Sequence, residues 1–227
     1  MSRLQLSIRV RQENISRRGL KRIRREKKFW DTFAGRYDKF MNRFAGAYSD
    51  LVTLMVSDLN RNDEILEVAT GTGIVALAIG DKVTMVDAVD ISRPMIAVAV
   101  EKAKSEDIRN VRFSVQDCYS LSYGDARFDA CIIANTLHVL MEPESALIEI
   151  RRVLKTDGIV IAPTYCHGEN LKTRMISLIM RFSGFRVYHK FTISSFVDFF
   201  ETNGFSVVKK RVLKEIVPLV YLVARPR

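Results

Sequence analysis

The sequence has few cysteines, no long apolar run and fewer acidic than basic residues, and each shortage limits what the chain can be. Its 227 residues include three cysteines, Cys118, Cys131 and Cys166, without the spacing of metal ligands. We expect reduced thiols in a cytoplasmic protein and no metal site. The run from Ile216 to Ala224 is far shorter than the roughly 20 apolar residues that span a bilayer. No signal peptide is predicted, because the basic N-terminus lacks an apolar segment.

The shortage of acidic residues is confined to one end of the chain. The sequence has 36 Lys and Arg against 26 Asp and Glu, a net charge of +10, of which residues 1–28 contribute +9. We therefore divide the chain into a basic N-terminal arm, residues 1–28, and a single domain, residues 29–227. Four interpretations of the arm stay open: a solvated tail, contact with an anionic membrane surface, binding of RNA, and an Arg-rich transit peptide.

Hydrophobic periodicity predicts alternating helices and strands along the domain. Residues 29–41 and 48–59 have helical spacing, and further helices are expected at 74–80, from Ser92 onward, and at 143–155, 170–182 and 193–203. Asp157-Gly158 and Asn203-Gly204 are expected to end the helices before them. Strands are expected at 64–69, 83–89, 111–116, 128–134, 159–164, 205–213 and 217–224. This order predicts an α/β fold: a parallel sheet covered on both faces, closed by an antiparallel pair.

The most informative segment is Glu67-Val68-Ala69-Thr70-Gly71-Thr72-Gly73, between an apolar strand and an apolar helix. Glycine has no Cβ, so such a turn lets the backbone approach a ligand closely, and the N–H groups of the following helix point toward it. The next strand ends at Asp90, whose carboxylate could accept hydrogen bonds from both hydroxyls of a ribose. The pattern therefore predicts a cofactor that contains a nucleoside.

Glu67 decides between two classes of cofactor. The spacing Gly71-x-Gly73-x-x-Ala76 also fits the dinucleotide fingerprint. However, an anion four residues before Gly71 would repel a pyrophosphate and attract a cation. S-adenosylmethionine (SAM) has a sulfonium, an ammonium and no phosphate, so the residues favour SAM over a nicotinamide dinucleotide.

The combined pattern resembles the class I SAM-dependent methyltransferases, whose first signature is Glu-x-x-x-Gly-x-Gly. Segments 90–96, 116–118, 127–138 and 147–158 resemble later parts of the same family. Arg36-Tyr37-Asp38 is similar to an element of the ubiquinone/menaquinone (type 11) methyltransferases and of bacterial phospholipid N-methyltransferases. The resemblance covers residues 29–227. It implies a doubly wound, Rossmann-like sheet of seven mostly parallel strands with a C-terminal antiparallel hairpin.

The resemblance also implies roles for individual residues. Asp117 would accept a hydrogen bond from the adenine amino group, beside the backbone of Cys118. Ile91 and Met95 would contact the two faces of the adenine, and Asn135 would contact the methionine end through its backbone carbonyl. The residues expected to hold SAM are Glu67, Ala69, Thr70, Gly71, Gly73, Asp90, Ile91, Met95, Asp117, Cys118 and Asn135.

Catalytic residues are harder to predict, because methyl transfer needs a general base only when the acceptor must lose a proton. His138 is the best-placed candidate and His167, just after the fifth strand, is the second. The resemblance implies that Tyr37 lies on a helix that closes over SAM.

The acceptor is expected to be a small or amphiphilic molecule. Residues 165–205 are rich in Met and Phe, and residues 134–137 lack the Pro-Pro-Tyr or Pro-Pro-Phe motif of many base methyltransferases. The alternatives are an RNA or protein methyltransferase guided by the arm, a nucleotide-binding oxidoreductase, and a SAM-binding protein without catalysis.

Overall fold

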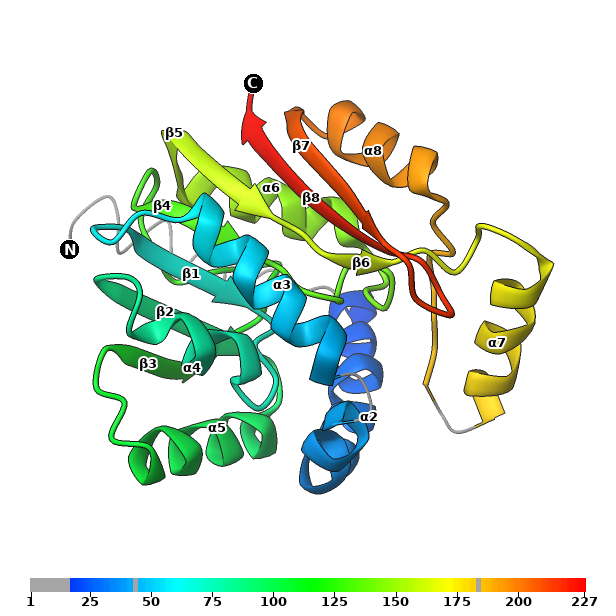
Figure 1. The fold of residues 1–227 in the computed structure, drawn as a ribbon. Coiled ribbons are helices and arrows are strands. Elements are labelled where there is room, and N and C mark those ends of the chain that lie inside the picture. The colour runs from blue at the N-terminus through cyan, green and yellow to red at the C-terminus, as the bar shows by residue number, and fades with distance from the viewer. Residues whose placement is uncertain (1–16, 43–44, 183–184) are drawn as a thin grey trace.

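The structure, a computed structural model, describes residues 17–42, 45–182 and 185–227. They form the expected mixed α/β fold around one sheet (Figure 1). The strands follow the order β3-β2-β1-β4-β5-β8-β6, and β7 also pairs with β8. The parallel strands are β1 (Glu64–Val68), β2 (Met85–Asp90), β3 (Val111–Val115), β4 (Phe128–Ile132) and β5 (Leu154–Ile161). The antiparallel strands are β6 (Thr164–Tyr165), β7 (Phe205–Leu213) and β8 (Leu219–Pro226).

Helices cover both faces of the sheet. Ile65 of β1 packs in a buried cluster with side chains of α3 and α4, and its neighbour Leu66 packs in a second cluster with α6 and α8. Successive strand residues point to opposite faces, so both faces of β1 are buried, as parallel strands require. The helices are α2 (Arg17–Met41), α3 (Ala45–Asp58), α4 (Ile74–Gly80), α5 (Arg93–Ser105), α6 (Pro143–Val153), α7 (Leu171–Phe182) and α8 (Ile193–Thr202).

The predicted end of α6 at Asp157-Gly158 is wrong. The helix ends at Val153, and β5 begins at Leu154, which is 4% exposed and pairs with Phe128 of β4. The pairing then shifts register between Phe128 and Ala130. A Cβ at Gly158 would lie 3.0 Å from the carbonyl oxygens of Asp129 and Lys155. This glycine therefore allows close backbone contact inside an irregular strand and does not end a helix.

The sheet has eight strands where the sequence predicted seven. The extra strand, β6, begins to pair with β8 at Thr164, three residues after the last β5 pairing at Ile161. Pro163 lies between them and has no N–H group to donate to the ladder. The expected C-terminal hairpin is present as β7 and β8.

Helix α2 crosses the expected boundary between arm and domain at residues 28 and 29. It begins at Arg17 and continues to Met41, while residues 1–16 of the arm lie outside the described part of the chain. In Figure 1 α2 lies beside the arrowheads of the parallel strands, whereas α7 stands apart from the sheet. None of the described helices is long and apolar enough to cross a membrane.

Candidate functional site

A cavity lies at the carboxyl ends of the central strands, where ligands bind in such sheets. It is partly open to solvent. Strands β1, β2 and β4 end at its wall, and the loop after β3 forms one side. The residues predicted from sequence that line it are Tyr37, Ala69, Gly71, Asp90, Ile91, Met95, Asp117, Cys118 and Asn135.

The carboxylate of Asp90 joins two backbone turns at the cavity wall. The N–H of Gly71 donates to Oδ2 at 2.9 Å, and the N–H of Ser92 donates to Oδ1 at 2.8 Å. Burial raises the pKa of Asp90 to about 6, although both hydrogen bonds oppose this shift. Each carboxylate oxygen can accept a second hydrogen bond. Asp90 therefore keeps the capacity to accept hydrogen bonds from ribose hydroxyls.

The glycine turn contains Gly71 and Gly73, which have different structural roles. Gly71 has φ +57°, and a Cβ there would lie 3.7 Å from Cε1 of Tyr37, which also lines the cavity. Gly73, which was expected to approach the ligand, does not line the cavity. It has φ +78°, and a Cβ there would lie 2.9 Å from the ring of Phe113 and 3.1 Å from Ala99. Gly73 thus serves the turn and its packing, whereas Gly71 keeps the cavity open.

Glu67 and Thr70 lie beneath this turn and do not line the cavity. Glu67 is 2% exposed and accepts a hydrogen bond of 2.6 Å from the Thr70 hydroxyl. Burial raises the pKa of Glu67 to about 8. A cation in the cavity would favour the ionised carboxylate, so the site is suited to a positively charged ligand.

Aromatic residues of α2 cover the cavity. Trp30 and Tyr37 line it, and they lie seven residues apart on one face of the helix. Burial, together with the neighbouring Tyr48, raises the pKa of Tyr37 well above its usual value. Tyr48 in turn accepts a hydrogen bond of 3.0 Å from the side chain of Asn135, which lines the opposite wall. These contacts support the expectation that Tyr37 lies on a covering helix.

Two aspartates connect α2 to the glycine turn and to α5. Asp31 accepts a hydrogen bond of 2.7 Å from the Ser92 hydroxyl. Asp38 accepts one from the Thr72 hydroxyl and pairs with Lys102 at 3.1 Å. Hence α2 contacts both the glycine turn and α5.

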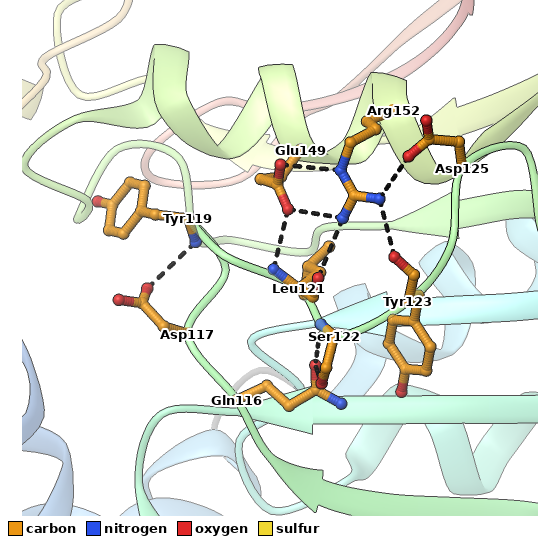
Figure 2. Close-up of polar contacts among 9 residues, drawn as sticks. All are labelled: Gln116, Asp117, Tyr119, Leu121, Ser122, Tyr123, Asp125, Glu149 and Arg152. Carbon is orange, nitrogen blue, oxygen red and sulfur yellow. Dashed lines mark hydrogen bonds and ion pairs between the residues drawn. The ribbon is translucent and has the colours of Figure 1, made fainter. Parts of the chain in front are cut away.

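The loop after β3 supplies Gln116, Asp117 and Cys118 to the cavity. Asp117 Oδ1 accepts a hydrogen bond of 3.1 Å from the N–H of Tyr119. Gln116 Oε1 accepts hydrogen bonds from the N–H and the hydroxyl of Ser122, at 3.0 and 2.8 Å (Figure 2). The loop therefore folds back on itself directly behind the cavity wall.

His138 lies next to the cavity and does not line it. Its side chain is buried, its Nδ1 atom has no hydrogen-bond partner, and its ring centroid lies 5.4 Å from that of His167. The ring of Phe185, 6.3 Å away, separates it from the aromatic side chains of α2. Burial lowers the pKa of His138 to about 3, so the imidazole is neutral at physiological pH.

Sequence reasoning missed several lining residues. Trp30 lies two helical turns before Tyr37, so its position on the same face could have been recognised. Val139 and Leu140 follow β4 in a segment that has no periodic pattern.

Two lining residues that were predicted, Ala69 and Asn135, have an unusual backbone. Their φ angles are +56° and +52°, a conformation that costs energy in most residues and often occurs at functional sites.

No three His, Cys, Asp or Glu side chains of the described residues cluster as metal ligands would. Cys131 and Cys166 are buried, and burial raises the pKa of both thiols. Cys118 is partly exposed in the cavity wall.

Comparison with known proteins identifies the central part of the chain. Residues 66–162 match the family model described as "Methyltransferase domain". Demethylmenaquinone methyltransferase of Bacteroides fragilis is 38% identical over 101 residues, which are 43% of this chain and 41% of that protein. Ubiquinone/menaquinone biosynthesis C-methyltransferase UbiE of Geotalea uraniireducens is 32% identical over 137 residues, 57% of this chain and 58% of that protein. The chain thus matches about half the length of these relatives.

Solved structures share the fold at low sequence identity. YcgJ of Bacillus subtilis has a TM-score of 0.68 and 19% identity, covering 78% of this chain and 97% of that one. The structure described as a DhpI–SAH complex has a TM-score of 0.69 and 21% identity, covering 90% of this chain and 97% of that one.

Replacing Asp90 tests the predicted ribose contact. Asp90→Ala removes a pair of charge-assisted hydrogen bonds to the ligand, each worth about 1.5–3 kcal/mol. We expect SAM affinity, measured by calorimetry, to fall at least about tenfold while the thermal unfolding midpoint shows a folded protein. Gly71→Val should weaken binding further, because its side chain would stand in the cavity. Unchanged affinity in Asp90→Ala would show that Asp90 does not hold the ribose.

The raised pKa of Glu67 predicts pH-dependent binding. The free protein holds a proton on Glu67 below its pKa of about 8, and a bound cation expels that proton. SAM affinity should therefore rise between about pH 6 and pH 7.5, by up to about tenfold per pH unit. Calorimetry in buffers of different ionisation enthalpy should detect proton release.

Glu67→Gln provides the control for this pH dependence. It should abolish most of the proton release and flatten the pH profile. The pH dependence of folding stability has the opposite sign to that of SAM binding. Folding raises the pKa of Glu67, so ionisation destabilises the free protein progressively from about pH 4.5 to about pH 8. The variant should lose less stability than its parent over that range. Equal proton release by the two proteins would contradict this assignment.

Proposed function

We propose that the chain, whose residues 66–162 match the model of a methyltransferase domain, transfers a methyl group from SAM to a small or amphiphilic acceptor. The observation that supports this most directly is that Asp90 and the Gly71 backbone meet at one cavity, with Glu67 buried beneath its glycine turn. The first two suit a ribose with an amino-acid tail, and the third suits a cation. SAM contains all three features.

The protein's contribution to this reaction is positioning and the exclusion of water. When bound, SAM supplies an electrophilic methyl group on a sulfonium. Asp90 would hold the ribose and Asp117 the adenine amino group, while Trp30 and Tyr37 cover the cavity. Correct orientation of two reactants can lower a barrier by roughly 7–11 kcal/mol.

An apolar or amphiphilic acceptor is supported by the side chains beside the cavity. Val139 and Leu140 line it, and the rings of Trp30, Phe185 and His138 follow one another next to it. Such a wall suits a planar or apolar molecule better than a charged one. The relatives described above are named as quinone methyltransferases, which agrees with an acceptor of this kind.

A second candidate function is methylation of RNA or protein. The observation that favours it is the charge of +9 in residues 1–28, which would attract an anionic macromolecule.

Methyl-labelled SAM distinguishes these functions. The protein is incubated with labelled SAM and, separately, with the lipid, RNA and protein fractions of one cell extract. Label in the lipid fraction is the expected result, and label in the RNA or protein fraction favours the second candidate. Asp90→Ala is the control for background transfer. No transfer above that background in any fraction would contradict the proposal.

His138 is proposed as the residue that accepts a proton when the acceptor needs a base. Its Nδ1 atom is buried and has no partner, and its imidazole is neutral, so it could accept a hydrogen bond from a hydroxyl of the acceptor. The ring of Phe185 lies between His138 and Trp30, which lines the cavity. Entry of the acceptor must therefore move Phe185 or α2.

His138→Gln tests this role. For a hydroxyl or an acidic carbon as acceptor, we expect kcat to fall by about 10²–10⁴ with SAM affinity unchanged. A thiolate or neutral amine acceptor should show little loss. His167→Gln is measured in parallel, because His167 is the second candidate base and its ring lies beside that of His138. A large loss of SAM affinity in His138→Gln would instead assign this residue a structural or cofactor-binding role.

We propose that residues 1–28 form a basic arm and that the protein acts at an anionic membrane surface. Helix α7 adds support for this. Its exposed residues Leu171, Met175 and Leu178 recur at helical spacing on one stripe, and Lys172 and Arg174 are exposed beside them. Apolar residues among basic ones suit binding to anionic lipid.

Neutralising the arm tests its role without interrupting α2. A full-length variant has Gln at Arg17, Arg18, Lys21, Arg22, Arg24 and Arg25. SAM affinity and thermal stability should stay nearly unchanged. Binding to anionic vesicles should weaken, because each basic residue near the surface is worth about 1 kcal/mol, and the difference should shrink with salt.

RNA binding is measured in parallel with the vesicles. A steep salt dependence of RNA binding, lost in the variant, would favour RNA over lipid as the partner of the arm. If both proteins behave alike on vesicles and on RNA, the arm is a passive tail.

A further inference from the structure

A buried ion pair on α6 lies outside the cavity and contacts the loop that forms one of its walls. Glu149 and Arg152 have side chains that are 10% and 17% exposed. Arg152 donates to both carboxylate oxygens of Glu149, from Nε to Oε1 at 3.0 Å and from Nη2 to Oε2 at 2.8 Å. Figure 2 shows both side chains reaching from the helix toward the loop between β3 and β4.

This pair binds the loop mainly through its backbone. Glu149 Oε2 accepts a hydrogen bond of 2.9 Å from the N–H of Leu121, and Arg152 Nη2 donates to the carbonyl of the same residue at 3.0 Å. Arg152 Nη1 donates at 2.8 Å to the carbonyl of Tyr123 and to Asp125. Leu121 is only 6% exposed, so its peptide groups need partners within the protein. The ion pair supplies them.

The same loop begins with residues that line the cavity. Asp117 lies four residues before Leu121, and Gln116 bonds to Ser122, immediately after Leu121. The contacts of Gln116 and Asp117 close the loop into a compact unit. A shift of Leu121 would therefore move the side chain of Asp117 relative to the cavity.

A gain in folding stability does not by itself explain why a charged pair lies here. Replacing a buried ion pair by apolar side chains of similar size is often neutral or stabilising, whereas removing one partner is costly. What apolar side chains could not do is fix the position of three peptide groups. We propose that Glu149 and Arg152 are positioning residues that hold Asp117 against the adenine of SAM and so set the preference for adenine. This inference rests on the proposed function.

The test compares two ligands, S-adenosylhomocysteine and its inosine analogue, which has an oxygen in place of the adenine amino group. The unmodified protein should prefer the adenine form at least about tenfold, since the analogue presents a carbonyl oxygen to Asp117 where adenine presents an amino donor. Glu149→Leu/Arg152→Met removes the pair without leaving a single buried charge. Calorimetry should show the preference reduced to within about threefold, while thermal unfolding shows a folded protein. Adding Asp117→Ala to this variant should reduce the preference no further.

A second ion pair provides the matched control. Lys209 and Asp58 join β7 to α3 with Nζ–Oδ1 at 2.7 Å, and neither residue lines the cavity. Asp58→Leu/Lys209→Met should keep the full preference for adenine, whatever its thermal midpoint. If the α6 double variant does not fold, Glu149→Gln replaces it, because Gln keeps an acceptor for Leu121 and should lower the preference by a smaller factor.

Two results overturn the inference. One is an unchanged preference for adenine in a folded α6 variant, and the other is an equal loss in the control variant. Failure of the unmodified protein to bind S-adenosylhomocysteine at all would overturn the proposed function, and this inference with it. Binding with no preference for adenine would overturn the inference alone.

Discussion

The buried carboxylate of Asp90 is the contact on which the site depends. Hydrogen bonds to the N–H groups of Gly71 and Ser92 join the turn after β1 to the start of α5. Burying a carboxylate is unfavourable, and these charged hydrogen bonds, each worth about 1.5–3 kcal/mol, offset part of that cost. Gly71 donates this N–H from a left-handed conformation, and as a glycine it adds no side chain to the cavity.

The position of α2, the helix that covers the cavity, depends on the same two turns. Ser92, whose N–H binds Asp90, also donates its hydroxyl to Asp31 of α2. Asp38, two helical turns later, binds Thr72 in the glycine turn. The helix that carries Trp30 and Tyr37 is therefore held by the residues that shape the cofactor site, and ligand binding and closure are expected to be coupled.

Local features were predictable from the sequence because they depend on few residues. The glycine turn, Asp90 at the end of β2 and the Ser92 cap of α5 each follow from a short pattern. The end of α6 was not predictable, because the pairing of Leu154 with Phe128 decides it. Likewise, contacts of the Glu149–Arg152 pair with the loop join segments about 28 residues apart, and no periodicity indicates them.

The central claim is that this cavity holds a nucleoside with a cationic amino-acid tail and no phosphate. Calorimetric titration of the full-length protein with SAM and, separately, with NADH tests it most directly. Glu67 is buried and ionises only when a cation balances its charge, so it favours SAM and offers a pyrophosphate no attraction; we expect one molecule of SAM bound per chain and no binding of NADH. Binding of NADH at the same site, or of neither ligand, would contradict the account.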